Sequence, residues 1–250
     1  IAHSTNVLAR AAANPVTNSM ARCARSVLKY VAGTTRVGIS YSHQQADEFQ
    51  KKYAELQHHS ENVGQTDPKQ LEAAVHTFTD ASFGVTYKSM KSISGCVTYL
   101  HGTPIAWRSR VQSVFASSTT ESEWCALSDG LQLESSIRAL HEFLLGKPQP
   151  DGPLWCDNRG AVVCGRKGPD CTDEIPKRTR HVALRLSKVL HEHKRLWFCP
   201  TNDQLADGLT KSINRQALQN ILHCNSEFPA DAELDGDEGE AAYYSFYTAM

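Results

Sequence analysis

The 250-residue sequence lacks the patterns that mark secreted, disulfide-stapled or membrane-spanning proteins. Its eight cysteines form no C-x-x-C pair, no apolar run reaches about 18 residues, and no signal-peptide pattern is present. These absences argue against a disulfide scaffold, paired zinc fingers and a transmembrane helix. We therefore expect reduced thiols in a soluble, intracellular protein that makes no use of a membrane.

A weaker metal candidate involves two histidines and a cysteine. His191, His193 and Cys199 lie close together in the sequence and are residue types that bind zinc. A zinc site would need a fourth ligand, and the spacing differs from that of paired fingers. We favour the alternative, a helix end followed by a buried cysteine.

Lys and Arg are absent from Asn225 onward, where the chain carries seven acids. The net charge of −1 therefore conceals a body, residues 1–224, with a net charge of +6. Such a body suits a polyanionic partner, and the acidic tail over residues 225–250 is predicted to be disordered. Charge alone fits a solvated surface with a solubilising tail equally well.

Hydrophobic periodicity predicts the main elements. Residues 18–32 form a basic amphipathic pattern that ends at Gly33 and predicts a helix. The polar, Gln-rich residues 43–74 predict a linker that can include a transient helix, with a domain boundary near residue 70. Beyond it, strands are predicted at 75–80, 94–100, 103–108, 153–156 and 196–199, and helices at 118–145, from Asn158, at 175–194 and from about Asn202. This order predicts an α/β fold with a mixed sheet flanked by helices, because a helix between strands usually crosses to a parallel neighbour.

Two acids follow β-prone runs. Asp80 ends the run in HTFTDASFG, and Asp157 follows the short strand PLWC. Because ligands bind outside the ends of neighbouring central strands, these two carboxylates are expected to meet. Taken alone, Asp157 could equally be a helix N-cap beside Asn158.

Two further acids complete the candidate cluster. Ser118-Thr119-Thr120-Glu121 has the form of a capping box, which gives Glu121 a structural role and leaves Glu123 as the better candidate to face the strand ends. Asp207, in QLADGLTK, is predicted to begin the last helix. By itself it would be read as a solvated surface residue.

Carboxylates that lie together repel one another unless a divalent cation neutralises them. Oxygen ligands suit Mg²⁺, with Mn²⁺ as the alternative, and both ions bind jointly to carboxylates and substrate phosphates. Two such ions about 4 Å apart can assist attack on a phosphodiester and departure of the leaving oxygen. The cluster therefore predicts a metal-dependent nuclease.

Six motifs resemble one known family. HTFTDASFG, KSISGCVTYLHGTPIAWRSR, SSTTESEWCALSDG, LWCDN, RTRH and QLADGLTK are similar to motifs of the ribonuclease H domain that ends the Pol polyprotein of copia-type retrotransposons. The resemblance covers residues 75–213 and implies a ribonuclease H-like fold. Residues 1–42 resemble the segment that joins the reverse transcriptase to this domain.

The resemblance implies hydrolysis of the RNA strand of RNA–DNA hybrids with Mg²⁺, beside the upstream reverse transcriptase of the same polyprotein and within a cytoplasmic particle. The family's metal-binding acids correspond to Asp80, Glu123, Asp157 and Asp207. Contacts to 2′-hydroxyls, by which proteins distinguish RNA from DNA, and other substrate contacts are assigned to Ser82, Ser118, Asn158, Arg180 and His181.

The sequence departs from the family pattern in three ways. Ser82 stands where many relatives have a second acid, the segment 199–206 lacks the mobile histidine of cellular ribonucleases H, and no polymerase Y-x-D-D motif is present. An alternative is a catalytically decayed hybrid-binding or scaffolding remnant of the same fold. A transposase or integrase is the third alternative, disfavoured because Glu123 lies on the first helix after the strands rather than on a late one.

Overall fold

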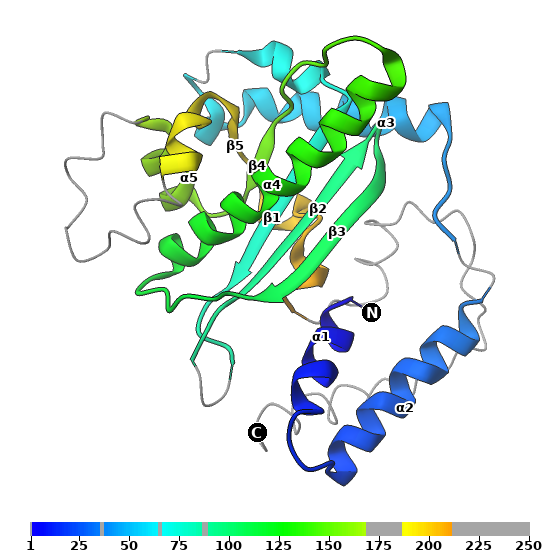
Figure 1. Ribbon diagram of the computed structural model, residues 1–250. Helices are drawn as coiled ribbons and strands as arrows, with labels where there is room; N and C mark the ends of the chain where they lie inside the picture. Colours follow the sequence, from blue (N-terminus) through cyan, green and yellow to red (C-terminus); the bar gives the residue numbers. More distant parts are fainter. Residues whose placement is uncertain (1, 36–37, 65–66, 87–89, 169–186, 212–250) are drawn as a thin grey trace.

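The structure is a computed structural model that describes residues 2–35, 38–64, 67–86, 90–168 and 187–211. One five-stranded sheet in the order β3-β2-β1-β4-β5 forms its centre (Figure 1). Neighbouring strands are antiparallel from β3 to β1 and parallel from β1 to β5. The strands are β1 (Val75–Ser82), β2 (Ile93–Leu100), β3 (Thr103–Val111), β4 (Leu154–Cys156) and β5 (Leu196–Phe198). This topology confirms the predicted ribonuclease H-like α/β fold.

The tight turn between β2 and β3 follows from two residues. His101 and Gly102 have φ angles of 47° and 73°. Positive φ at both central residues is what a type I′ two-residue hairpin turn requires, and glycine adopts it without strain. The predicted hairpin is thereby confirmed.

Helix α4 (Thr119–Leu145) crosses one face of the sheet (Figure 1). It begins where the Ser118 hydroxyl accepts a hydrogen bond from the Glu121 backbone N–H, and it ends at Gly146 in the left-handed conformation. Gly130 lets the helix approach the sheet closely, because a Cβ there would lie 2.4 Å from Cγ2 of Thr79. The close approach brings the first turns of α4 over the end of β1.

The predicted linker over residues 43–74 is wrong. Residues His43–Glu55 form α3, followed by the 3₁₀ turns η1 (Leu56–His58), η2 (Ser60–Asn62) and η3 (Pro68–Glu72). Phe49 and Tyr53, one helical turn apart, are buried in the core with Phe78, Tyr99 and Trp155. Burying a large side chain of this kind contributes about 1.5–3 kcal/mol. The segment therefore covers the face of the sheet opposite α4, and a boundary near residue 70 would cut this core.

The N-terminal part forms two helices. The predicted helix over 18–32 is confirmed as α2 (Asn18–Gly33), and it is preceded by α1 (Ala2–Ala11), which we had not predicted. Asn6 of α1 contacts Ser109 of β3 through an Nδ2–Oγ distance of 3.4 Å. Figure 1 shows both helices below the sheet, with α1 next to the end of β3. The bounds of the ribonuclease H-like domain, residues 75–213, stay a prediction.

After β4 the predicted helix from Asn158 is confirmed, whereas the two later predicted helices differ from the structure. Helix α5 (Arg159–Arg166) is capped by Asn158, whose Oδ1 accepts from the Ala161 N–H at 2.9 Å. Of the predicted helix 175–194, residues 175–186 lie outside the described residues, residues 187–191 are helical, and residues 193–195 form the 3₁₀ turn η6 (His193–Arg195). Between residues 201 and 211, where the description of the chain ends, two 3₁₀ turns, η7 (Thr201–Asp203) and η8 (Asp207–Leu209), replace the start of the helix predicted from Asn202. The predicted acidic tail, 225–250, lies outside the described residues.

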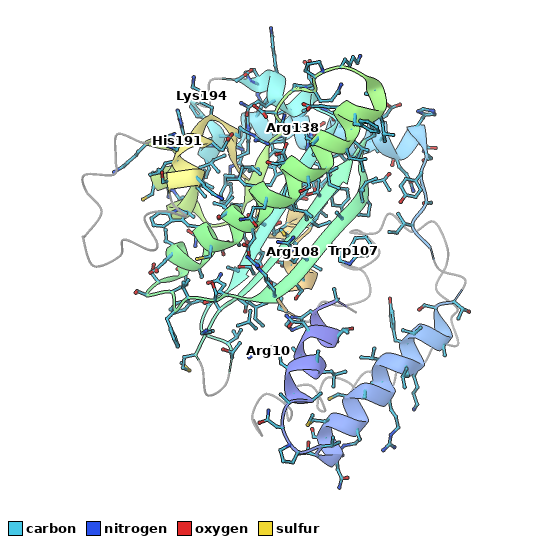
Figure 2. All side chains as sticks on the ribbon, in the orientation of Figure 1. Arg10, Trp107, Arg108, Arg138, His191 and Lys194 are labelled. Carbon is cyan, nitrogen blue, oxygen red and sulfur yellow. The ribbon has the colours of Figure 1, made fainter. Side chains whose placement is uncertain are left out.

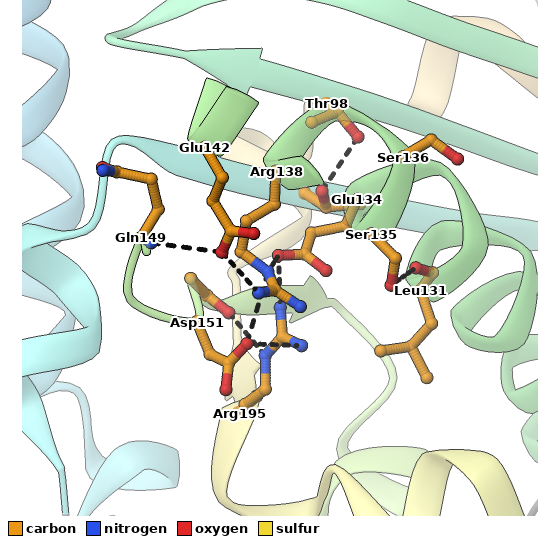
Figure 3. A network of polar contacts seen from close by, with 12 residues as sticks. Thr98, Leu131, Glu134, Ser135, Ser136, Arg138, Glu142, Gln149, Asp151 and Arg195 are labelled. Carbon is orange, nitrogen blue, oxygen red and sulfur yellow. Dashed lines mark hydrogen bonds and ion pairs between the residues drawn. The ribbon is translucent and has the colours of Figure 1, made fainter. Parts of the chain in front are cut away.

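A buried ionic network ties α4 to the starts of β4 and β5 (Figure 3). Nη2 of Arg195 lies 2.8 Å from Oε1 of Glu134, and its Nε donates to the backbone oxygen of Gly152 at 2.9 Å. Arg138 contacts the same Glu134 oxygen at 3.2 Å and reaches Glu142 at 3.0 Å. Glu134 is fully buried and Arg195 nearly so. The network therefore fixes the starts of β4 and β5, at the end of the sheet opposite the one where Asp80 and Asp157 lie.

The cysteines in the described part of the chain form no disulfide. Its six cysteines, Cys23, Cys96, Cys125, Cys156, Cys164 and Cys199, are all free thiols. Among the helices that the structure describes, none is sufficiently long and apolar to cross a bilayer.

Candidate metal centre

Strand register brings Asp80 and Asp157 together. The parallel pairing of β1 with β4 runs to Thr79 opposite Cys156, so each acid is the residue that follows this last pair. Asp80 lies within β1, opposite Gly95 of β2, rather than at the strand end as predicted. The carboxylates meet at the point where β4 ends and β1 continues beside β2.

Helix α4 contributes Glu123, as the sequence predicted. The Glu121 carboxylate instead accepts a hydrogen bond from the Ser117 backbone N–H at 2.7 Å, which confirms its structural role at the helix start. Glu123 lies two residues further on, is 5% exposed, and faces Asp157. The two acids of this helix therefore have separate roles, set by the face that each occupies.

Asp207 reaches the cluster through a close contact between the turn η8 and strand β2. A Cβ on Gly95 would lie 2.7 Å from Cβ of Leu209 and 2.8 Å from Cγ2 of Thr210, so the turn can rest there only on a glycine. The Thr210 hydroxyl donates a hydrogen bond to Asp80, and Nζ of Lys211 lies 2.9 Å from Oδ2 of Asp207. The residues that follow the turn thus contact both acids, Lys211 at Asp207 and Thr210 at Asp80.

The four acids form two overlapping groups that share Asp157. Ligand atoms of Asp80, Asp157 and Asp207 lie within 4.8 Å of one another, as do those of Glu123, Cys156 and Asp157. The segments that supply them are separated by long stretches of sequence. The fold therefore assembles, from four elements, an acidic cluster that could hold a metal ion.

Burial and mutual repulsion disfavour the ionised carboxylates in this cluster. Burial, followed by the charges of Asp80 and Asp157, raises the pKa of Glu123 well above its ordinary value. Burial and then Asp80 raise the pKa of Asp157 to about 6. Burial also raises the pKa of Asp207, although Lys211 opposes the shift. A bound divalent cation would remove the electrostatic cost of ionising these groups together.

One oxygen in the cluster has no partner in the described part of the chain. Oδ1 of Asp207 is inaccessible to solvent and makes no hydrogen bond there, whereas Oδ2 contacts Lys211. Oδ2 of Asp157 accepts from the Thr201 hydroxyl at 3.1 Å. An oxygen donor set with an unsatisfied buried carboxylate oxygen fits a hard divalent cation.

The residues proposed to contact substrate divide into two sets. Ser82 ends β1, Ser118 caps α4, and Asn158 caps α5, so all three lie at element ends near the acids. Arg180 and His181 lie outside the described residues. The zinc candidate gains no support, because His191, His193 and Cys199 do not form a group with converging ligand atoms in the described part of the chain.

Sequence reasoning missed the polar residues that surround the acids. Thr201, Thr210 and Lys211 contact Asp157, Asp80 and Asp207 respectively. Thr210 and Lys211 belong to the QLADGLTK motif, so the motif itself was the available signal.

Replacement of Gly95 by alanine is expected to displace η8 and to weaken divalent-metal binding roughly 10-fold or more, as loss of supporting contacts around a metal site does. Overpacking should also lower the free energy of unfolding by about 1–3 kcal/mol. Mn²⁺ binding by calorimetry and urea unfolding measure the two effects. Gly33→Ala is the matched control, because a Cβ there meets nothing within 4 Å. Unchanged Mn²⁺ affinity in Gly95→Ala would contradict the role assigned to this contact.

Comparisons with known proteins yield transposon relatives. The chain is 28% identical over 203 residues to a retrovirus-related Pol polyprotein from transposon RE2 of Arabidopsis thaliana, covering 79% of this chain and 12% of the relative. It is 26% identical, over the same length and with the same coverage, to the retrovirus-related Pol polyprotein from transposon RE1 of the same plant. It is 25% identical over 224 residues to the retrovirus-related Pol polyprotein from transposon TNT 1-94 of Nicotiana tabacum, covering 88% of this chain and 14% of the relative. The chain thus spans less than one sixth of these relatives.

Among solved structures, one match is the N-terminal ribonuclease H domain of a Mycobacterium tuberculosis protein, fused to maltose-binding protein. It is 13% identical, covers 69% of this chain and 98% of that chain, and has a TM-score of 0.36. No family model matches the chain. The sequence relatives and the sheet topology confirm the resemblance stated above, because a ribonuclease H domain of a Pol polyprotein fits both.

Proposed function

We propose that the chain is a metal-dependent endonuclease that hydrolyses the RNA strand of RNA–DNA hybrids as part of a retrotransposon Pol polyprotein. One observation carries the proposal. Four carboxylates from β1, α4, the end of β4 and η8 converge in a ribonuclease H-like fold. A decayed remnant has no need to retain all four, and nothing in the described structure favours that alternative.

Asp80, Glu123, Asp157 and Asp207 are the residues that would hold Mg²⁺ or Mn²⁺. Such ions, when bound, supply positive charge that stabilises the attacking and leaving oxygens of a phosphodiester. The chain itself provides the anionic ligands and orients them, through Thr210 at Asp80 and Thr201 at Asp157. Lys211 offsets part of the negative charge beside Asp207.

Selection of the RNA strand would depend on contacts to 2′-hydroxyl groups. Ser82 and Ser118 offer hydroxyls and Asn158 offers an amide, each at the end of an element that also carries an acid or lies beside one. Because Ser118 and Asn158 also cap helices, their side-chain oxygens already accept backbone hydrogen bonds. Their remaining donor groups would face the substrate.

A basic surface beside the sheet supports a nucleic-acid partner. No Asp or Glu occurs before Asp47, and Arg10, Arg22, Arg25 and Lys29 of α1 and α2 are exposed. Figure 2 shows Arg10 below the end of the sheet and Arg108 higher, over the middle of the sheet. Such side chains suit contacts with phosphates, which supply most of the affinity in nucleic-acid binding. We further propose the upstream reverse transcriptase as the covalent neighbour and a cytoplasmic particle as the location.

The decisive test is cleavage of a hybrid whose RNA strand is labelled, by the full chain, with and without Mg²⁺. We expect cleavage of the RNA strand in the hybrid with Mg²⁺ or Mn²⁺, and none after chelation. The same strand annealed to RNA, or left single, should survive, as should the DNA strand. If the purified, folded protein binds the hybrid but leaves it intact with either ion, the scaffolding alternative would replace the nuclease.

A further inference from the structure

A thiol lies within the acidic cluster. Cys156, the last residue of β4, is fully buried, and its Sγ lies 3.8 Å from Oε2 of Glu123. Its sulfur, one oxygen of Glu123 and one of Asp157 all lie within 4.8 Å of one another. The proposed hydrolysis has no use for this thiol, because Mg²⁺ and Mn²⁺ favour oxygen ligands. The sulfur thus adds a soft donor to a site whose other donors are hard.

One contact of the sulfur favours a metal-bound thiolate, although burial and then the charge of Glu123 raise the pKa of the free Cys156 thiol well above its ordinary value. The backbone N–H of Asn158 donates to Sγ at 3.4 Å. A donor directed at a ligand atom orients it and stabilises its charge, as outer contacts of metal ligands do. On its other side Cys156 packs against the apolar cluster that contains Leu127, Leu154 and Val162. The sulfur is therefore fixed in place, while the partly exposed Asp157 leaves a route from solvent.

We propose that Cys156, Glu123 and Asp157 form a second, overlapping binding site for a thiophilic divalent cation of the Zn²⁺ and Cd²⁺ class. One thiolate and two carboxylates are ligand types that such ions accept, and a water can complete the coordination. Binding breaks the S–H bond, forms a sulfur–metal bond and releases the proton to solvent.

The site makes the proposed nuclease sensitive to thiophilic metals. Glu123 and Asp157 cannot serve both sites fully, so a bound Zn²⁺ or Cd²⁺ withdraws them from Mg²⁺. At mixed donor sites Zn²⁺ also binds more tightly than Mn²⁺ does. This inhibitory consequence rests on the proposed function, whereas binding of the thiophilic ion does not.

Binding of Cd²⁺ alone to the metal-free, reduced full chain tests the site. The ultraviolet thiolate-to-cadmium charge-transfer band reports sulfur ligation without any need for activity. We expect a saturable band whose strongest component is lost in Cys156→Ser, with Cd²⁺ affinity lowered roughly 100-fold, at the upper end of losses seen around metal ligands. Cys199→Ser is the matched control, because Cys199 is equally buried but belongs to no converging ligand group in the described structure.

Two further measurements distinguish a metal site formed by all three residues from binding to the Cys156 thiol alone. Glu123→Gln keeps the sulfur and should still weaken Cd²⁺ binding, and excess Mg²⁺ should shift the wild-type titration to higher Cd²⁺ concentration. Cys156→Ala replaces Cys156→Ser if circular dichroism shows the serine variant to be unfolded. Identical bands in wild type and the Cys156 variant, or in wild type and Glu123→Gln, would overturn the proposal.

The outcomes also distinguish this site from the nuclease. Mg²⁺-dependent hybrid cleavage by a protein with no Cys156-dependent band would reject the thiophilic site and leave the nuclease standing. A Cys156-dependent band in a protein that cleaves nothing would do the reverse.

Discussion

Asp157→Asn is expected to lower the rate of hybrid cleavage by several orders of magnitude, while Glu121→Gln leaves it nearly unchanged. Asp157 belongs to both converging groups, so its loss removes an anionic ligand that an amide cannot replace. In Glu121→Gln the new side-chain amide would still offer an oxygen to the Ser117 N–H, which is the contact that Glu121 makes at 2.7 Å. A time course of RNA cleavage in Mg²⁺ measures both variants.

Measurements of hybrid binding distinguish the loss of a metal ligand from the loss of the folded structure. Hybrid affinity should survive Asp157→Asn, because it rests on contacts between basic side chains and phosphates. Circular dichroism and hybrid binding without divalent metal are therefore measured for each variant. An inactive Glu121→Gln beside an active Glu123→Gln would show that the functional face of α4 had been assigned wrongly by two residues.

The positions of the strands and all four cluster acids could be read from the sequence, and the acids of β1, α4 and β4 followed from local patterns. Alternation in residues 75–80 marks β1, and the capping box separates Glu121 from Glu123 by role. The parallel partner of β1 followed from the long crossover helix. These features need no knowledge of distant contacts beyond the rule that strand ends meet.

The errors arose where distant contacts decide the structure. Residues 43–74 are polar in composition, yet Phe49 and Tyr53 of α3 pack in the core against the sheet. A helix was expected from Asn202, but the segment rests on Gly95, and the hydrogen bond from Thr210 to Asp80 spans 130 positions. Local propensity contains no information on either contact.

The ionic network at the other end of the sheet yields the last expected result: Arg195→Met should lower the free energy of unfolding by about 3 kcal/mol, the lower end for breaking a buried pair. The change removes an ion pair to the fully buried Glu134 (Figure 3). It also removes the hydrogen bond to the backbone oxygen of Gly152. Arg138 still contacts Glu134 at 3.2 Å, which limits the loss. Urea denaturation measures the difference from wild type.

Two variants test whether an uncompensated buried charge is the cause. Arg138→Met should cost less than Arg195→Met, because Arg138 is partly exposed and Glu134 keeps its buried partner. Adding Glu134→Leu to Arg195→Met should recover part of the loss, since removing both charges avoids desolvating an unpaired one.

The ionic network and the acidic cluster lie at opposite ends of the sheet. Arg195 and Gly152 come before β5 and β4, whereas Asp80 and Asp157 follow the last paired residues of β1 and β4. Mn²⁺ affinity of folded Arg195→Met should therefore match wild type, and a parallel loss of metal affinity would show that the two ends of the sheet are coupled.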